Sequence, residues 1–192
     1  LPIRLFELKC PPLANANTHL LQPHSDHARE WFALIQSNLT HLNQWLSCPA
    51  LMKTPLDVAS FLNTAARHNR AGTALILLLQ YQGKICGVLS YNDFQAHEGS
   101  ANIGYWLGEA YQGDGIVSTA LPVLVQYGFT QLGLKQVFIR VAEGNDKSAA
   151  IPKRSGFQLI DTDEGSEILH QQAINHHVYA MRQEDWAGVS AQ

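Results

Sequence analysis

Residues 103–117, IGYWLGEAYQGDGIV, join a predicted strand to a predicted helix through a loop with three glycines. The strand is expected to begin near Ala101, and the helix to run from Ile116 to about Leu132 and end at Gly133. Glycines let such a loop turn tightly and expose its backbone N–H groups, and the helix adds the positive end of its dipole. The stretch therefore predicts a site for a phosphate or pyrophosphate, although an exposed turn between a strand and a helix favours glycine as well.

Two common phosphate motifs do not fit this loop. The chain contains no Gly-Lys-Ser or Gly-Lys-Thr, which excludes the P-loop of nucleotide hydrolases. Gly113, Gly115 and Ser118 match half of the dinucleotide fingerprint. That fingerprint belongs to an opening βαβ unit, whereas strands joined by short turns precede this loop.

Those strands are predicted over residues 73–81, 84–92 and 101–107, with turns at Gln82-Gly83 and Glu98-Gly99. Because the links are short, the three strands are expected to form an antiparallel meander.

The remainder of the chain is predicted to mix helices and strands. Ahead of the meander we expect a strand over 18–21, a helix capped by Ser25, a helical segment over 41–46 and a helix opened by Pro55. After the long helix we expect a strand over 137–141, a helix over 146–154, and strands over 157–160 and 175–181. This order predicts an α/β (α+β mixed) fold, with a mixed sheet and helices on both faces.

Composition indicates a single domain over residues 1–192, with an irregular lead-in over 1–17 and a polar tail over 187–192. Hydrophobic residues make up 46% of the chain and charged residues 15%, which is typical of a globular protein. The net charge is −3, so no basic excess is available to bind a nucleic-acid backbone. The longest apolar run, residues 74–79, is far shorter than a membrane span. We therefore expect neither a nucleic acid nor a membrane as partner.

Cysteine and histidine usage argues against a disulfide framework and against a metal site. Cys10, Cys48 and Cys86 are odd in number and lack CxxC spacing, which favours buried or incidental thiols in a reducing cytoplasm. The nine histidines include no HExxH motif. His176 and His177 are adjacent on a predicted strand, so their side chains are expected to point to opposite faces. We expect a cytoplasmic protein without a metal.

Residues 103–107 followed by 112–116 (QGDGI) resemble the acetyl-CoA loop of the GNAT N-acetyltransferases. Further matching segments follow in the order of the family, at 87–92 (GVLSYN), 145–148 (NDKS), 150–157 (AIPKRSGF) and 175–181 (NHHVYAM). Within the superfamily, the chain most resembles the RimJ/RimL type, which acetylates protein N-termini. The resemblance spans about residues 18–186. It implies a GNAT fold with a mostly antiparallel sheet whose strands splay apart at the acetyl-CoA site.

The resemblance implies acetyl-CoA as co-substrate and a set of residues that hold it. The loop residues whose N–H groups would bind the pyrophosphate are Gln112, Gly113, Gly115, Ile116 and Val117. Main-chain groups of Trp106 and Leu107 would pair with the pantetheine. Asn145 would bond the coenzyme arm and Ser148 would face the acyl sulfur, although both residues are also favoured at helix N-termini without any function.

One loop residue departs from the family pattern. Asp114 stands where Lys or Arg is common, and a carboxylate there opposes phosphate binding unless it points to solvent.

The resemblance also implies two catalytic residues. Many GNAT enzymes have a Tyr that protonates the departing thiolate, but the matching position here is Pro152, which leaves the Ser148 hydroxyl as the donor. Glu167 matches the carboxylate that acts as base in RimL-type enzymes, although its acidic neighbours over 161–164 also fit an ordinary solvated surface.

The pKa of the acceptor amine decides how much a base must contribute. An α-amine has a pKa of ~7.7–8.0, so deprotonating it near neutral pH costs only about 1 kcal/mol. A lysine, with a pKa of ~10.4, would cost on the order of 4 kcal/mol. This difference favours an α-amine as acceptor.

The implied acceptor is a protein N-terminus, with the acidic stalk protein of the large ribosomal subunit as the suspected partner. Trp45 is expected to line the acceptor groove, and Trp31 to pack in the core. The resemblance also implies a homodimer. Two other functions stay open: acetylation of a small amine such as a polyamine or an antibiotic, and a non-enzymatic CoA-binding sensor on the same fold.

Overall fold

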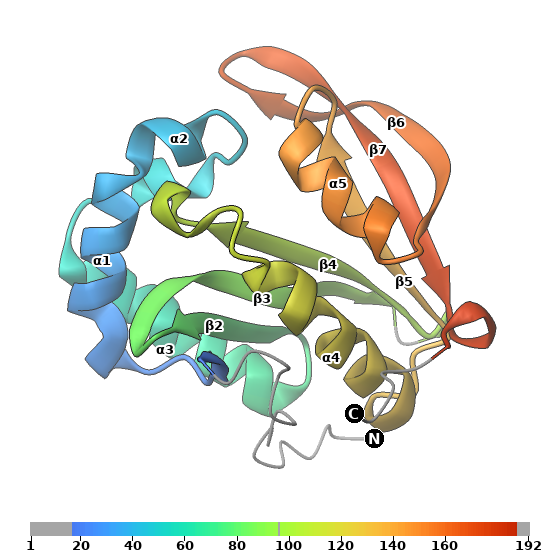
Figure 1. Cartoon of the computed structure of the whole chain (residues 1–192). Coiled ribbons are helices and arrows are strands. Elements are labelled where there is room, and N and C mark those ends of the chain that lie inside the picture. The colour runs from blue at the N-terminus through green and yellow to red at the C-terminus, as the bar shows by residue number, and fades with distance from the viewer. Residues whose placement is uncertain (1–16, 96, 188–192) are drawn as a thin grey trace.

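Seven strands form one sheet in the computed structural model of the chain, which describes residues 17–95 and 97–187 (Figure 1). The order across the sheet is β1-β2-β3-β4-β5-β7-β6, and β4–β5 is the one parallel pair within it. The expected mixed, mostly antiparallel sheet is therefore confirmed. The strands are β1 (Thr18–Leu21), β2 (Leu75–Tyr81), β3 (Lys84–Gln95), β4 (Ser100–Leu107), β5 (Gln136–Ala142), β6 (Gln158–Leu169) and β7 (Gln172–Arg182).

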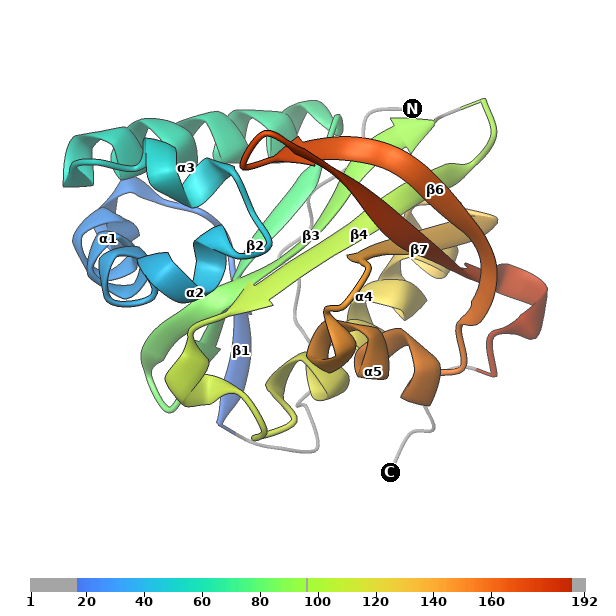
Figure 2. The same cartoon turned by 90° about the horizontal axis from the view of Figure 1, so that it is seen from above.

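Helices cover both faces of this sheet, as Figures 1 and 2 show. Helices α1 and α3 pack on one face against Leu78, Ile85 and Val88, and α4 packs on the other face in a larger core. The helices are α1 (Ala28–Ser37), α2 (Leu39–Asn43), α3 (Pro55–Ala71), α4 (Ile116–Gln131) and α5 (Asp146–Arg154), with 3-10 turns at Ser25–His27, Cys48–Leu51, Glu109–Tyr111 and Gln183–Asp185.

A close contact with β3 fixes the position of α4. The buried Tyr91 of β3 donates its hydroxyl to the Leu124 carbonyl at 2.9 Å. One turn later, a Cβ on Gly128 would lie 2.3 Å from the Tyr91 hydroxyl oxygen, so only glycine allows this approach. The contact holds α4, and with it the glycine loop at its N-terminus, directly on the sheet.

The parallel pair β4–β5 separates part-way along its length. Pairing runs from Ser100 opposite Gln136 to Ile103 opposite Ile139. Beyond that point β4 continues to Leu107 and β5 to Ala142 without pairing to each other. The expected splay is confirmed, and it leaves main-chain groups of β4 available to a ligand.

The last two strands are longer than the sequence pattern indicates. The strand expected over 157–160 runs from Gln158 to Leu169, and the strand expected over 175–181 from Gln172 to Arg182. Nearly all of β6 is exposed or half-buried, so it lacks the apolar alternation by which a strand is recognised. As a result Glu167 lies in β6 of a long hairpin, two residues before that strand ends at Leu169.

Two helix boundaries near the N-terminus also differ from expectation. His24, and not Ser25, occupies the cap position of the first turn, where its Nδ1 accepts from the Asp26 N–H at 3.3 Å. The helical segment expected over 41–46 ends at Asn43, which leaves Trp45 beyond α2. The lead-in and the tail lie outside the described residues, except for residues 17 and 187.

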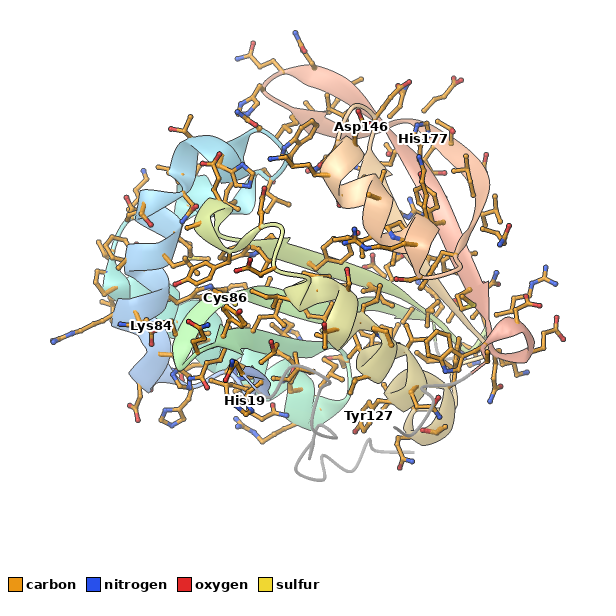
Figure 3. All side chains as sticks on the ribbon, viewed as in Figure 1. His19, Lys84, Cys86, Tyr127, Asp146 and His177 are labelled. Carbon is orange, nitrogen blue, oxygen red and sulfur yellow. The ribbon has the colours of Figure 1, made fainter. Side chains whose placement is uncertain are left out.

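Only one cysteine side chain is described. Cys86 is fully buried in the core (labelled in Figure 3), as expected of an incidental thiol, and burial raises its pKa to about 12. Cys10 and the side chain of Cys48 lie outside the described part.

The start of α3 gives a stability prediction. Thr54 and Asp57 form a capping box, in which the Asp57 N–H donates to Thr54 Oγ1 at 3.2 Å and the Thr54 N–H to Asp57 Oδ2 at 2.8 Å. Thr54→Ala should lower the free energy of unfolding by about 1 kcal/mol in urea denaturation. Ser25→Ala is the control and should change it by less than ~0.5 kcal/mol, because Ser25 caps nothing. Equal effects of the two changes would contradict the assignment of the caps.

Candidate active site

The splay between β4 and β5 opens into a cleft of about 1440 Å³. It is bordered by α2, the loop before α4, α5 and the β6–β7 hairpin, which arches over the sheet toward α2 and α3 in Figure 2. All of the residues predicted to be functional line this cleft: Trp45, Trp106, Leu107, Gln112, Gly113, Gly115, Ile116, Val117, Asn145, Ser148 and Glu167. The sequence motifs, far apart in the chain, are therefore brought to one place.

The glycine loop presents free N–H groups to the cleft. Gly113 and Gly115 have φ angles of +94° and +73°, a conformation that glycine adopts without strain. Among the described residues, the N–H groups of Gly113, Gly115, Ile116 and Val117 have no acceptor, and no side chain caps α4. The Gln112 N–H differs, because it donates to the Glu109 carbonyl at 3.2 Å. The loop thus has the unpaired donors that a pyrophosphate requires.

The Gln112 side chain ties the loop to two helices. Its Nε2 lies 2.8 Å from His41 Nε2 on α2, and its Oε1 accepts from Lys147 Nζ on α5 at 3.3 Å. On the other side of the loop, Arg154 of α5 donates from Nε to Ser118 Oγ at 2.9 Å. Two cations, Lys147 and Arg154, therefore flank the loop and favour an anion there. Sequence reasoning assigned neither of them.

The register of β3 and β4 decides which main-chain groups face the splay. The Gly108 N–H donates to the Cys86 carbonyl at 2.9 Å, and the register is unbroken from there to Asn92. Hydrogen-bonded and non-hydrogen-bonded residue pairs alternate along an antiparallel ladder. Counting from Gly108, the N–H and C=O groups of Trp106 point toward β3, and those of Leu107 point to the open side. The expectation that Trp106 offers free main-chain groups does not fit this register. Its ring instead stacks on Trp31, with centroids 6.0 Å apart.

A tyrosine from β4 reaches the start of α5. The Tyr105 hydroxyl donates to the Ser148 carbonyl at 2.9 Å and lies 3.3 Å from Ser148 Oγ. Burial raises the pKa of Tyr105 to about 12, so its phenol stays protonated at neutral pH. Pro152 stands on α5 at the position where the resemblance places a Tyr, and the phenol of Tyr105 approaches the same helix from β4 instead. The signal that could have found Tyr105 is its place in the segment 103–107, but strand alternation assigns it to the core.

Asn145 caps α5. Its Oδ1 accepts from the Ser148 N–H at 3.2 Å. This is the capping role that residues of this type take at helix N-termini without any function in binding. Its side-chain Nδ2 is left to bond a ligand.

Glu167 projects from β6 into the cleft. Its side chain is 41% exposed, and its Oε2 lies 3.5 Å from His176 Nε2. The nearby Arg140 is paired with Asp163, so it does not neutralise Glu167. A carboxylate that water reaches is suited to accept a proton from an incoming amine.

The profile of the Acetyltransferase (GNAT) domain matches residues 18–158, most of the chain. The chain belongs to the GNAT acetyltransferase family. Sequence relatives agree. Ribosomal-protein-serine acetyltransferase of Escherichia coli (strain K12) is 29% identical over 156 residues, which are 81% of this chain and 87% of that protein. YdaF of Bacillus subtilis (strain 168) is 33% identical over 112 residues, which are 57% of this chain and only 60% of YdaF.

Solved structures of GNAT acetyltransferases have the same fold. The microcin C7 self-immunity acetyltransferase MccE, in complex with acetyl-CoA and AMP, has a TM-score of 0.84 and 34% identity, over 88% of this chain and 93% of that chain. RimL, the ribosomal L7/L12 α-N-protein acetyltransferase, in complex with coenzyme A, has a TM-score of 0.85 and 25% identity, over 91% and 98%. The resemblance drawn from the loop and the segments that follow it is therefore confirmed.

On the far side of this GNAT cleft, α2 meets the β6–β7 hairpin. Trp45 is half-buried and lines the cleft just beyond α2. His170, in the turn of the hairpin, places its Nε2 2.6 Å from the Asn43 carbonyl at the end of α2. This contact joins the two elements that border the cleft opposite the loop.

Within residues 17–95 and 97–187, no group of three or more His, Cys, Asp and Glu side chains is placed to hold a metal ion. No helix in that part of the chain has the length and apolar character needed to cross a membrane.

Asp114 gives a second prediction. Its side chain is exposed at the loop, so water screens its charge from the anion site. Asp114→Asn should lower the Kd for coenzyme A by no more than about threefold in titration calorimetry at low salt. At 0.5 M salt the difference from wild type should vanish, since the Debye length is then only ~4 Å. A gain of tenfold or more that persists in salt would show that Asp114 faces the phosphates directly.

Proposed function

We propose that this GNAT protein transfers the acetyl group of acetyl-CoA to the α-amine at the N-terminus of a protein, with a ribosomal protein as acceptor. The observation that carries the proposal is that one cleft holds both a loop with free N–H groups and the unneutralised carboxylate of Glu167. The names of the Escherichia coli relative and of RimL support a ribosomal acceptor.

Acetyl-CoA supplies an acetyl thioester, and the chain's own residues bind and orient it. The N–H groups of Gly113, Gly115, Ile116 and Val117 would hold the pyrophosphate, with Lys147 and Arg154 beside them. The main chain of Leu107 would pair with the pantetheine, and its N–H would polarise the thioester carbonyl. The Asn145 amide would bond the coenzyme arm.

The proposed chemistry is direct attack by the free amine, without a covalent enzyme intermediate. Glu167 would accept the proton of the amine, through a water molecule if the distance requires it. The Ser148 hydroxyl donates to the Tyr105 oxygen at 3.3 Å in the structure and would turn to donate a hydrogen bond to the departing thiolate, while Tyr105 stays anchored on the Ser148 carbonyl. A hydrogen bond is all that this pair can give, because the Tyr105 phenol, with a pKa of about 12, does not fully protonate a thiolate whose conjugate acid has a pKa of ~8.5.

A small amine is the second candidate acceptor. MccE, 34% identical to this chain, was solved with AMP as well as acetyl-CoA, so a protein of this fold binds a nucleotide as well as the coenzyme. Trp45, half-buried at the far side of the cleft, would stack equally well on a nucleobase or against a peptide.

The experiment is thiol release from acetyl-CoA against a panel of acceptors, with product masses. The panel holds peptides that start with Ser, Ala or Met, the ribosomal stalk protein, a lysine peptide with a blocked N-terminus, spermidine, and an AMP derivative with a free amine. We expect transfer to the α-amine of a peptide or of the stalk protein. Transfer to spermidine or the AMP derivative alone would replace the acceptor class, and binding of acetyl-CoA without any transfer would favour a sensor.

The homodimer and the cytoplasmic location stay predictions. Light scattering during size-exclusion chromatography would test the first, and cell fractionation the second.

A further inference from the structure

His176 lies in the cleft, and the proposed chemistry does not use it. Its side chain is only 13% exposed, and it lines the cleft together with Ser166 and Glu167. Its Nδ1 lies 2.9 Å from Ser166 Oγ, and its Nε2 lies 3.5 Å from Glu167 Oε2. Both ring nitrogens therefore face groups of β6.

An irregularity in the β6–β7 hairpin brings these groups together. Asp163 pairs with His176 and Glu167 with Ile174, so β6 carries extra residues between the two pairs. Within them, Gly165 has a φ of +57°, and its N–H donates to Asn175 Oδ1 at 3.0 Å. Such bulges redirect side chains, and here the bulge turns Glu167 back toward His176.

The partners of the ring determine its tautomer. A carboxylate only accepts hydrogen bonds, whereas a hydroxyl donates or accepts. A neutral imidazole can therefore serve both partners only with its proton on Nε2. In that form Nε2–H faces Glu167, and Ser166 donates to Nδ1.

We propose that His176 is a positioning residue for the base: its Nε2–H holds the ionised carboxylate of Glu167 in place for the acceptor amine, and Ser166 fixes the tautomer. This role rests on the proposed function of Glu167. The proton leaves the amine nitrogen for the Glu167 carboxylate, and no bond to His176 is made or broken.

The arrangement has a consequence for activity in acid. Protonation of the ring would set a cation beside Glu167, which makes the carboxylate a weaker base and repels an acceptor ammonium. Among the charged groups that β5 and β6 place on this side, Arg140 and Asp163 are paired with each other, and Asp161 lies opposite Val178, further along β6. kcat should therefore fall as acid protonates His176.

Two substitutions separate the N–H donor from the charge. His176→Ala removes the donor and should lower kcat at saturating acceptor roughly tenfold on the neutral plateau. His176→Gln keeps an uncharged N–H donor and should retain kcat within about threefold on the neutral plateau. The part of the decrease of kcat in acid that comes from protonation of the imidazole should disappear in this variant. Equal kcat and an equal acid limb in His176→Ala and wild type would overturn the proposal.

The adjacent histidine is a matched control. His177, labelled in Figure 3, lies on the same strand and has a similar partner, because its Nδ1 lies 3.1 Å from Thr162 Oγ1. It points to the opposite face and does not line the cleft. His177→Gln should leave both kcat and the acid limb unchanged, and an effect as large as that of His176→Gln would overturn the proposal.

A second readout needs no turnover. The imidazole ¹⁵N shifts of the free protein, compared with those of His176→Gln for assignment, should show the neutral ring protonated on Nε2. Ser166→Ala should weaken that preference. A neutral ring protonated on Nδ1 would overturn the proposal even in an active enzyme. An Nε2–H ring in a protein that acetylates no amine would support the arrangement and overturn the proposed function instead.

Discussion

Glu167→Gln is expected to lower kcat/KM for a peptide α-amine roughly 100-fold at pH 7, and the loss should shrink as the pH rises above 8. The amide cannot accept the proton of the amine, and general bases typically contribute 10²- to 10⁴-fold. At pH 7 only about a tenth of an α-amine with a pKa of ~7.7–8.0 is unprotonated. Above that pKa the free amine predominates, so the enzyme needs the base less. The measurement is a pH–rate profile with a peptide that starts with Ser.

Glu164→Gln is the control for this prediction. Glu164 lies on the same strand, and its substitution removes the same charge as Glu167→Gln does. Its side chain is exposed and does not line the cleft. Its substitution should leave kcat/KM within about twofold of wild type. If Glu167→Gln kept full activity at every pH, or if both variants lost activity equally, Glu167 would not be the base.

The part of the site next to the coenzyme could be predicted well from the sequence. Glycines at 113 and 115 and the N-terminus of α4 are local features, and the bounds of α5 agree with those expected, 146–154. Local backbone rules are sufficient there because turn geometry and helix capping depend on near neighbours in the chain. Even so, which main-chain groups of Trp106 and Leu107 are free depends on pairing with β3 and not on the motif.

The part next to the acceptor could not be predicted in the same way. Glu167 was located by resemblance, but its contact with His176 depends on the register of the β6–β7 hairpin and on a bulge at Gly165. Polar residues on both faces of β6 hide its length from pattern reasoning. Tyr105 was missed for a related reason, since strand alternation says which face a side chain takes, but not that α5 begins beside that hydroxyl.

The conformation of the glycine loop depends on single backbone positions, so one substitution should be enough to impair coenzyme A binding. Gly115 has a φ of +73°, at the cap position of α4, with nothing within 4 Å of the place where a Cβ would lie. A β-branched residue there does not collide with any neighbour, but it opposes this left-handed conformation at a cost of roughly 1–2 kcal/mol or more. The chain should relieve the strain by rotating the loop, which turns the N–H groups of Gly115 and Ile116 away from the pyrophosphate. Gly115→Val should therefore raise the Kd for coenzyme A roughly 10- to 100-fold in titration calorimetry.

Gly133→Val is the control that separates backbone strain from the loss of coenzyme A binding. It follows the opposite end of α4 with a φ of +68°, and a Cβ there would also meet nothing within 4 Å. Gly133→Val should lower the free energy of unfolding about as much as Gly115→Val does, because the backbone cost is the same. Its Kd for coenzyme A should nevertheless stay within about twofold of wild type, since no N–H group near Gly133 faces the cleft. Equal loss of affinity in the two variants would mean that general destabilisation, and not the aim of the loop, weakens binding. A Gly115→Val variant with wild-type affinity would place the pyrophosphate away from the N-terminus of α4.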